Sequence, residues 1–318
     1  MVKRKKRRTL MGIRVAVHGG RKFHADECFA VGALMMALGQ MQVIRTRDPQ
    51  VLKSCDFRLD VGGRYDPATG DYDHHQPDCP KRADNIPYAS FGLVWRRYGA
   101  QICGDQRVAD YVDSTLVCSI DAQDNGFSLY QAETVEGVKP FTINDLVRAF
   151  NPDTEDMKEK EAMALIDGAF AAVISLCQTF LEAQIEVASM ALRDYGLIGE
   201  AIAEAEDPRM IIVDKFCPEW QYSVLDQSSS ALIMVSKYSD NSGWSICCIP
   251  HVTRGSRYRA YLPKHLAGLK DAELEAASGI KGLTFCHKNL FVANASTREA
   301  AIALAQLAIA EHETIAKG

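Results

Sequence analysis

The pattern of apolar and polar positions predicts alternating strands and helices in the first part of the chain. The segment 13–20 is a short apolar run that ends in His and two Gly, as expected of a buried strand followed by a loop. The segment 26–40 is apolar on all sides and contains a closing Gly, which favours a buried helix. Further strands are expected at 42–49 and 56–63, with a short helical turn over 51–55. This order predicts a parallel sheet in an α/β fold, with sites at the carboxyl ends of its strands.

A second α/β unit is expected in the last third of the chain. The pattern over 85–149 is mainly helical, and apolar residues at i, i+3, i+4 and i+7 predict a long helix over 157–192. A capping box predicts that Ser296 opens the last helix as its N-cap, with Glu299 three residues on. The expected strands of this unit are 210–216, 231–238, 244–252 and 256–263, followed by a helix over 266–279 and a strand with a hairpin over 283–296.

These patterns divide the chain into four parts. The predicted parts are a basic tail (1–11), a first domain (12–155), a long helix with a linker (156–207) and a C-terminal domain (208–318). The tail "MVKRKKRR" is expected to be disordered, and a nuclear address or an arm that touches nucleic acid remains open.

Composition and charge exclude some classes of protein. The chain has 318 residues, of which 47% are hydrophobic and 24% charged, and its net charge is -5, which argues against a globally basic nucleic-acid coat. A polyanion would therefore need a local patch or metal ions. The ten Cys show no C-x-x-C spacing, which favours reduced thiols in a cytoplasmic protein. No apolar run is expected to reach the length needed to span a membrane.

Candidate metal-ligating residues gather in four short motifs of the first domain, "HGGRKFHADE", "DVGG", "DHH" and "IDAQDNG". Each lies at or near the end of a predicted strand or helix. Imidazole and carboxylate ligands without thiolates suit Mn²⁺, Mg²⁺, Fe²⁺ or Zn²⁺, and there are more candidates than one ion needs. Two ions about 3.5–4 Å apart serve in-line displacement at phosphorus. The candidates are His18, His24, Asp26, Asp60, Asp73, His74, His75, Asp121 and Asp124.

Each motif alone has an ordinary structural explanation. "DNG" is a common turn, "DVGG" is another, and the acidic pair after His24 could simply complement the dipole of a helix. Taken together they favour a metal cluster, because half of the eight His in the chain fall in two of the four motifs. Neither a G-x-S-x-G elbow nor a G-x-x-x-x-G-K-[ST] phosphate loop occurs in the sequence.

In this order the motifs resemble those of the DHH phosphoesterase superfamily. That superfamily usually begins with a His followed by two Asp, whereas here His24 replaces the first Asp. This departure, "RTRDP", "DVGGRYDPATGDYDHHQ" and the later "YRAYLPK" and "STREAAIALA" are similar to the melanocyte-proliferating-gene exonuclease family. The resemblance covers residues 12–315. It implies a two-domain DHH-type α/β phosphoesterase, with a parallel-sheet N-terminal domain, a smaller α/β C-terminal domain and an active site in the cleft.

The resemblance also implies metal ligands. His18 and His24 would hold one ion, and Asp26 and His74 the other, with Asp60 as the bridge between them. Asp124 would complete the second site, because the "DNG" turn exposes its carboxylate, and Asp121 is the alternative.

Two further residues of the "DHH" motif would act beside the metals. His75 would face the phosphoryl oxygens, and Asp73 would orient an imidazole. Two divalent ions, with Mn²⁺ as the expected metal, would activate a water for attack on phosphorus.

The C-terminal domain would then bind the substrate. Its basic span could contact phosphate with arginine forks, and the start of the last helix could bind an anion. An ordinary charged strand face and a plain capped helix are the alternatives. The candidate substrate-binding residues are Arg254, Arg257, Arg259, Lys264, His287 and Thr297.

The predicted function is a metal-dependent 3′–5′ exonuclease that acts on RNA or short oligonucleotides. The exonuclease activity is implied by the resemblance alone. A small-molecule phosphohydrolase, acting on pyrophosphate, a nucleotide or a cyclic dinucleotide, is the first alternative. A metal-binding interaction protein or a protein hydrolase is the second. A homodimer, and a nuclear or mitochondrial location, remain open.

Overall fold

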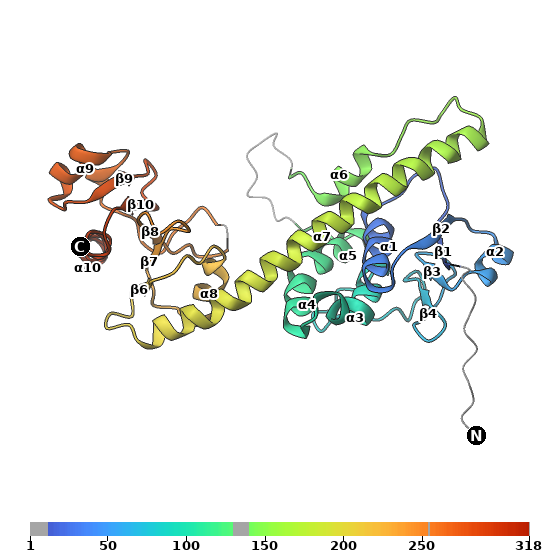
Figure 1. The fold of residues 1–318 in the computed structure, drawn as a ribbon, viewed down its shortest axis with the longest axis horizontal. Coiled ribbons are helices and arrows are strands. Elements are labelled where there is room, and N and C mark those ends of the chain that lie inside the picture. Colours follow the sequence, from blue (N-terminus) through green and yellow to red (C-terminus); the bar gives the residue numbers. More distant parts are fainter. Residues whose placement is uncertain (1–11, 130–139, 254, 318) are drawn as a thin grey trace, which may run out of the picture. The chain divides into compact units, whose positions relative to one another are not determined.

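The computed structural model describes residues 12–129, 140–253 and 255–317 (Figure 1). The chain forms two compact units, a first unit that ends at Ala188 and a second unit that begins at Ser189. The boundary falls within the longest helix, α7 (Glu159–Ala203). The basic tail lies outside the described residues.

The first unit contains a five-stranded sheet in the order β2-β1-β3-β5-β4. The first four strands in this order pair in parallel, and β4 pairs with β5 in the antiparallel direction at one edge. The parallel α/β arrangement predicted from the sequence is therefore present, with one antiparallel edge strand. The strands are β1 (Ile13–Val17), β2 (Met41–Arg45), β3 (Phe57–Leu59), β4 (Tyr65–Asp66) and β5 (Asp71–Tyr72).

Helices surround this sheet. The first ten residues of α1 are buried, which explains why its sequence is apolar on all sides. A single π-helical turn, Asp113–Val117, joins α4 to α5. The helices are α1 (Ala25–Leu38), α2 (Pro49–Ser54), α3 (Ser90–Cys103), α4 (Gln106–Val112), α5 (Cys118–Asp124) and α6 (Ile143–Ala149).

The helix α7 packs against α1 along an apolar stripe. Phe180 meets Phe29 with ring centroids 6.2 Å apart, and a side chain at Gly32 would contact Gln178. By length and composition α7 could also cross a membrane, with a mean hydropathy of 1.7 over its most apolar stretch, of which 33% is buried in the protein. The expectation that no apolar run is long enough for a membrane is therefore wrong.

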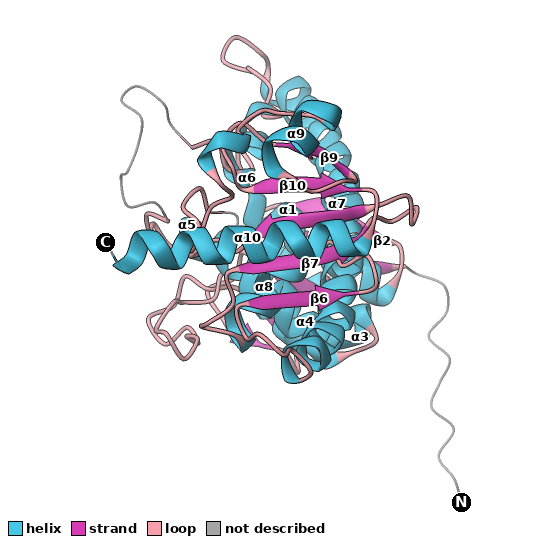
Figure 2. Ribbon diagram, turned by 90° about the vertical axis from the view of Figure 1, so that its left-hand side faces the viewer, coloured by secondary structure: helices cyan, strands magenta, loops and turns pink. Residues whose placement is uncertain are grey.

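The second unit has a mixed sheet in the order β6-β7-β8-β10-β9, and α10 lies across one of its faces (Figure 2). The strand β6 pairs with β7 in parallel and the other pairs are antiparallel. The elements are β6 (Met210–Val213), α8 (Trp220–Gln227), β7 (Ile233–Lys237), β8 (Trp244–Cys248), a 3₁₀ turn (Lys264–Leu266), α9 (Asp271–Ser278), β9 (Leu283–Cys286), β10 (Val292–Ala295) and α10 (Arg298–Lys317).

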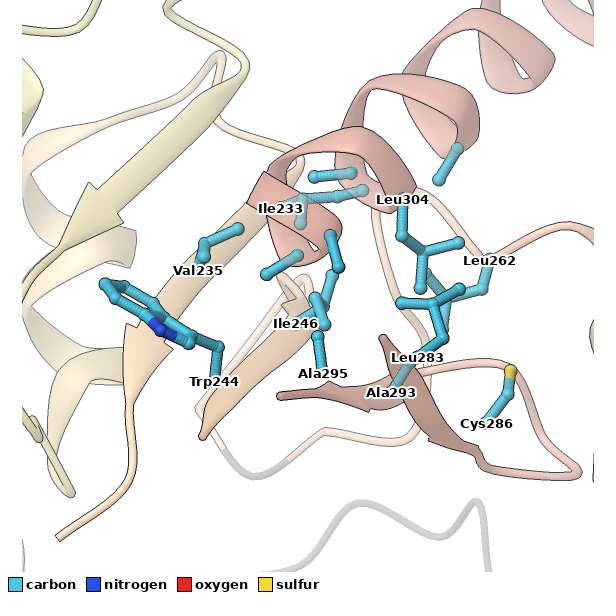
Figure 3. Packing of buried hydrophobic residues seen from close by; sticks show 14 of the residues in the cluster. Ile233, Val235, Trp244, Ile246, Leu262, Leu283, Cys286, Ala293, Ala295 and Leu304 are labelled. Carbon is cyan, nitrogen blue, oxygen red and sulfur yellow. The ribbon is translucent and has the colours of Figure 1, made fainter. Parts of the chain in front are cut away.

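The apolar core of this unit fills the space between the sheet and α10 (Figure 3). Ile233, Ile246 and Leu304 are fully buried there, so one face of each element supplies the core. Two expectations are corrected. The segment 256–263 is irregular, with one bridge from Tyr258 to Pro250, and is not a strand. The cap of α10 is Thr297, whose hydroxyl accepts from the Ala300 N–H, rather than the predicted Ser296.

Two neighbouring residues of α7 test its packing. Ile166 is fully buried, whereas Leu165 is 46% exposed. We expect Ile166→Ala to lower the free energy of unfolding by about 2–4 kcal/mol, because it removes buried methyl groups and leaves a cavity. Leu165→Ala should change it by less than about 0.5 kcal/mol. Urea denaturation followed by circular dichroism measures both, and equal losses would contradict the packing described for α7.

Candidate metal centre

The loops that follow β1, β3 and β5 meet at one edge of the first unit's sheet. His18 follows β1, Asp60 follows β3, and His74 lies just beyond β5. The strand β1 lies between β2 and β3, and this kind of switch in strand order is where open α/β sheets bind ligands. Asp60 has a φ of 56°, a left-handed conformation that is uncommon outside glycine and that concentrates at functional sites.

His18, His24 and Glu27 form a first group of side chains at this edge. One ligand atom from each lies within 4.8 Å of the other two. The Glu27 carboxylate lies 3.7 Å from Nδ1 of His18 and 3.7 Å from Nδ1 of His24. It also accepts a hydrogen bond from the backbone N–H of His24, so the start of α1 fixes the spacing. Donors of this kind suit a divalent metal ion.

Asp26, His74 and Asp124 form a second group, and Asp60 lies between the two groups. The ligand atoms of the second group also lie within 4.8 Å of one another. Oδ2 of Asp60 is 3.8 Å from Nδ1 of His18, whereas its Oδ1 is 3.3 Å from Nε2 of His74. Because its two oxygens face different groups, this carboxylate could contact two cations at once.

The N-terminus of α3 holds Asp26 in position. Its carboxylate accepts hydrogen bonds from the backbone N–H groups of Ser90, at 3.1 Å, and Phe91, at 2.7 Å. The Ser90 hydroxyl donates to the Tyr72 carbonyl and accepts from the Asp60 N–H. One helix start therefore ties together the ends of β3 and β5 and the first turn of α1.

Asp121 is held by a buried arginine. Its carboxylate lies 2.7 Å from the Arg82 guanidinium, which also contacts Asp113 at 2.8 Å. Asp121 accepts from the Gly92 N–H, and a Cβ at Gly92 would lie 1.8 Å from its carboxylate oxygen. Of the two alternatives left open by the sequence, Asp124 thus joins the second group, whereas Asp121 is engaged by Arg82.

The adjacent histidines have different surroundings. The His74 side chain is 7% exposed and the His75 side chain 64%. Asp73 lies 2.7 Å from Nδ1 of His75 and accepts from the His74 backbone N–H at 2.8 Å. Burial would raise the pKa of Asp73, but hydrogen bonds from His75 and Gly63 outweigh burial and lower it. The carboxylate of Asp73 therefore orients the exposed imidazole.

The cluster has an excess of negative charge. Burial raises the pKa of Asp26 well above its usual value, and the charges of Asp124 and Asp60 add to the effect. Burial also raises the pKa of Glu27. For His74, burial would lower the pKa, but the carboxylates of Asp124 and Asp60 outweigh it and raise the pKa to about 11. An added cation would balance these carboxylates.

Three buried atoms of the cluster have no hydrogen-bond partner among the described residues. They are Nδ1 of His18, Oε2 of Glu27 and Nε2 of His74. Nε2 of His74 lies 3.1 Å from Asp124, but without the angles of a hydrogen bond. Buried polar atoms without partners cost free energy, and metal coordination would satisfy all three. The residues present therefore fit a site for divalent metal ions.

A cavity of about 990 Å³ opens over this cluster. Its volume is at the upper end of ordinary small-molecule sites. Besides the His and Asp of the cluster, it is lined by polar residues from the loops after β1 and β2, from the end of α5 and from α6, among them Lys22, Arg47, Gln123, Asn144 and Arg148.

The predicted substrate-binding residues of the second unit have varied surroundings. Arg254 lies outside the described residues, and Arg257 and Lys264 are exposed. Arg259 donates to the backbone carbonyls of Ser228 and Ala231, at 2.8 and 3.0 Å. This half-buried guanidinium is engaged by backbone carbonyls.

The other two candidates of the second unit belong to local structure. Nδ1 of His287 accepts from the Asn289 N–H, and its ring lies 4.5 Å from that of Phe291. Thr297 caps α10. Neither observation assigns a substrate contact.

Sequence reasoning missed Glu27, Arg82 and Ser90. Glu27 had a signal, because it stands one helical turn after His24 in "HADE". Arg82 and Ser90 had none, because their partners lie far away in the chain. Asp113 and Asp121 follow Arg82 by 31 and 39 residues, and Asp26 lies 64 and 65 residues before Ser90 and Phe91 at the start of α3. Only the fold brings these groups together.

Comparisons with solved structures give distant similarities. A pGpG-specific phosphodiesterase, PggH, from Vibrio cholerae is 13% identical, with a TM-score of 0.28, 95% of this chain and 99% of that chain being covered. RecJ of Thermus thermophilus, in complex with Mn²⁺, is 12% identical, with a TM-score of 0.27, covering 94% of this chain and 52% of that chain. Similarity at this level does not by itself establish a shared activity.

Relatives of known name are much closer in sequence. The MYG1 exonuclease of Homo sapiens is 30% identical over 348 residues, which cover 97% of this chain and 89% of that protein. A MYG1 protein of Schizosaccharomyces pombe is 29% identical over 326 residues, covering 93% of this chain and 97% of that protein. The family model named for the MYG1 exonuclease, described as uncharacterised protein family UPF0160, matches residues 14–309. The chain therefore belongs to the MYG1 exonuclease family.

Proposed function

We propose that this protein is a metal-dependent hydrolase of phosphodiester bonds, and specifically an exonuclease that shortens RNA or other short oligonucleotides from the 3′ end. The observation that carries the proposal is the position of Asp60, with one oxygen toward His18 and the other toward His74. Two ligand groups that share one carboxylate could hold two ions close together, which suits two-metal hydrolysis. The names of the MYG1 exonuclease relatives favour the same reaction.

The two groups assign the metal ligands of this proposal. His18, His24 and Glu27 would hold one ion. Asp26, His74 and Asp124 would hold the other, and the two ions would share Asp60. The family resemblance had implied the same ligands except Glu27, which is added because it contacts both histidines of the first group. Bound divalent ions would supply an activated water and charge neutralisation at the transferring phosphoryl group.

The remaining side chains prepare the site for this chemistry. The Asp73 carboxylate forms a hydrogen bond with Nδ1 of His75. Nε2 of this exposed ring is then available to contact a phosphoryl oxygen or the departing oxygen. The N–H groups of Ser90 and Phe91 restrain Asp26, so its carboxylate needs little reorganisation. Mn²⁺ is the metal we propose, because carboxylate and imidazole donors suit it.

The size of the cavity bears on the alternatives. At about 990 Å³ it exceeds what pyrophosphate would need, and it is bordered by amides as well as by charged groups. This favours a nucleotide-containing substrate over pyrophosphate.

In the second unit, we propose that Arg257 and Lys264 contact the substrate. We also propose a cytoplasmic location for the protein.

The two aspartates of α5 should respond differently to substitution. We expect Asp124→Asn to weaken Mn²⁺ binding at least about tenfold without loss of stability, since it removes a metal ligand and relieves carboxylate repulsion. Asp121→Asn should instead destabilise the fold by about 1–3 kcal/mol, because it weakens a buried contact with Arg82. Isothermal titration with Mn²⁺ and thermal unfolding without metal measure the two effects. A loss of metal binding confined to Asp121→Asn would reverse the assignment.

Asp60→Asn should abolish turnover while the protein stays folded. We expect the rate on a labelled short RNA with Mn²⁺ to fall by about a thousandfold, because the carboxylate shared by the two ligand groups is lost. Asp110→Asn is the matched control, since Asp110 is exposed on α4. Pyrophosphate and a generic phosphodiester, assayed alongside, identify the substrate class. A fully active Asp60→Asn protein would exclude the shared role, and preference for pyrophosphate would favour the first alternative.

A further inference from the structure

Two cations that line the cavity differ from seven arginines of the first unit, each of which pairs with a carboxylate. Lys22 and Arg47 have no acidic partner within the described part of the chain, whereas nearby arginines are paired. Arg21 contacts Glu159 at 2.7 Å and Arg45 contacts Asp167 at 3.2 Å. The same is true of Arg58, Arg64, Arg82, Arg107 and Arg148, each of which contacts an Asp. Both unpaired cations face the metal cluster's cavity.

The loops that carry these cations are fixed by close packing. Nε of Arg47 donates to the Gly19 carbonyl at 3.3 Å, and a Cβ at Gly19 would lie 2.7 Å from the Thr46 nitrogen. The loops after β1 and β2 therefore touch, and only a residue without a side chain fits at Gly19. Asn151 adds a second restraint, because its amide accepts from the Phe23 N–H and donates to the Phe23 carbonyl.

The helix α6 lines the same cavity with further polar groups. Arg148 contacts Asp145 on its own helix and remains largely exposed, so its guanidinium retains donors for a second anion. The side-chain amides of Asn144 and Gln123 have no hydrogen-bond partner among the described residues. They are able to bind a sugar or a base.

The charges of the cavity are separated. The carboxylates of Asp60 and Asp124 lie with the histidines, whereas Lys22 and Arg47 are cations that cannot ligate a metal ion. Cations beside a site for divalent ions repel those ions. An anion bound between them is attracted to the metal ions and to the side-chain cations alike. A phosphate bound through metal ions at the carboxylates and histidines, and a second phosphate at Lys22 and Arg47, would satisfy both parts of the cavity.

We propose that Lys22 and Arg47, with Arg148, form a subsite for a second phosphate, next to the one that is hydrolysed. The substrate class is then a nucleotide chain with at least two phosphates, held within the first unit. This inference rests on the proposed function, since it takes the metal groups as the site of hydrolysis. It adds contacts in the first unit to those proposed for Arg257 and Lys264 in the second unit.

The test uses binding of a phosphorothioate-linked RNA tetranucleotide, which resists cleavage, to the full chain in Mn²⁺. We expect Lys22→Ala/Arg47→Ala to weaken binding about tenfold at low salt, because two phosphate contacts are lost. The slope of log K against log salt should shrink by about 1.4, or about 0.7 for each contact. A 5′-mononucleotide, which has one phosphate, should lose less than about twofold in affinity. Fluorescence anisotropy with competition measures all three.

Lys53→Ala/Arg107→Ala is the matched control. It removes the same charge from exposed positions of the first unit that do not line the cavity. This control should keep the wild-type slope. The subsite is wrong if the two double variants have the same slope, or if tetranucleotide and mononucleotide lose affinity by the same factor. If the subsite fails in one of these ways but the wild-type protein still cleaves RNA, the proposed function stands. If the wild-type protein binds Mn²⁺ but binds neither the tetranucleotide nor the mononucleotide, the subsite and the proposed function are both wrong.

Discussion

The crowding of buried carboxylates is the constraint on which the first unit depends. Asp26 and Glu27 are almost completely buried, and Asp60 and Asp124 lie close to them around His74. Burial removes water from the Asp26 carboxylate, and the neighbouring carboxylates of Asp124 and Asp60 repel its charge; both effects raise the pKa of Asp26. The fold offsets part of this cost with the N–H groups at the start of α3 and with imidazoles. Bound cations would offset the remaining repulsion. The buried carboxylates that destabilise the metal-free protein therefore also prepare it to bind metal ions.

Asp121 and Asp124 show how packing separates the roles of two identical side chains. They stand one turn apart at the end of α5, so their spacing alone gives no preference. Asp121 is buried against Arg82, and although burial raises its pKa to about 7, the arginine and the Gly92 N–H lower it from what burial alone would give. No arginine among the described residues forms an ion pair with Asp124, whose carboxylate lies 3.1 Å from Nε2 of His74. A buried ion pair thus removes one carboxylate from the cluster and leaves the other available.

The sequence predicted the parts of the fold and of the site that depend on local pattern. The apolar run before His18, the buried helix after His24 and the glycines after Asp60 were enough to place three motifs at the ends of elements that lie together. The sequence could not show that Arg82 would engage Asp121, or that Arg259 would turn toward backbone carbonyls, because those contacts link segments far apart in the chain. For the same reason, Lys22 and Arg47 gave no signal until the cavity was known. Periodicity also missed the irregular course of 256–263, where alternation of side chains is not accompanied by strand pairing.

The proposed function places one carboxylate, that of Asp60, between two divalent ions at the edge of the first sheet. Anomalous diffraction at the manganese edge from crystals grown with Mn²⁺ tests it most directly. The account predicts two peaks about 3.5–4 Å apart, with one beside His18, His24 and Glu27, the other beside Asp26, His74 and Asp124, and Asp60 between them. A single peak, or peaks away from these residues, would contradict the account.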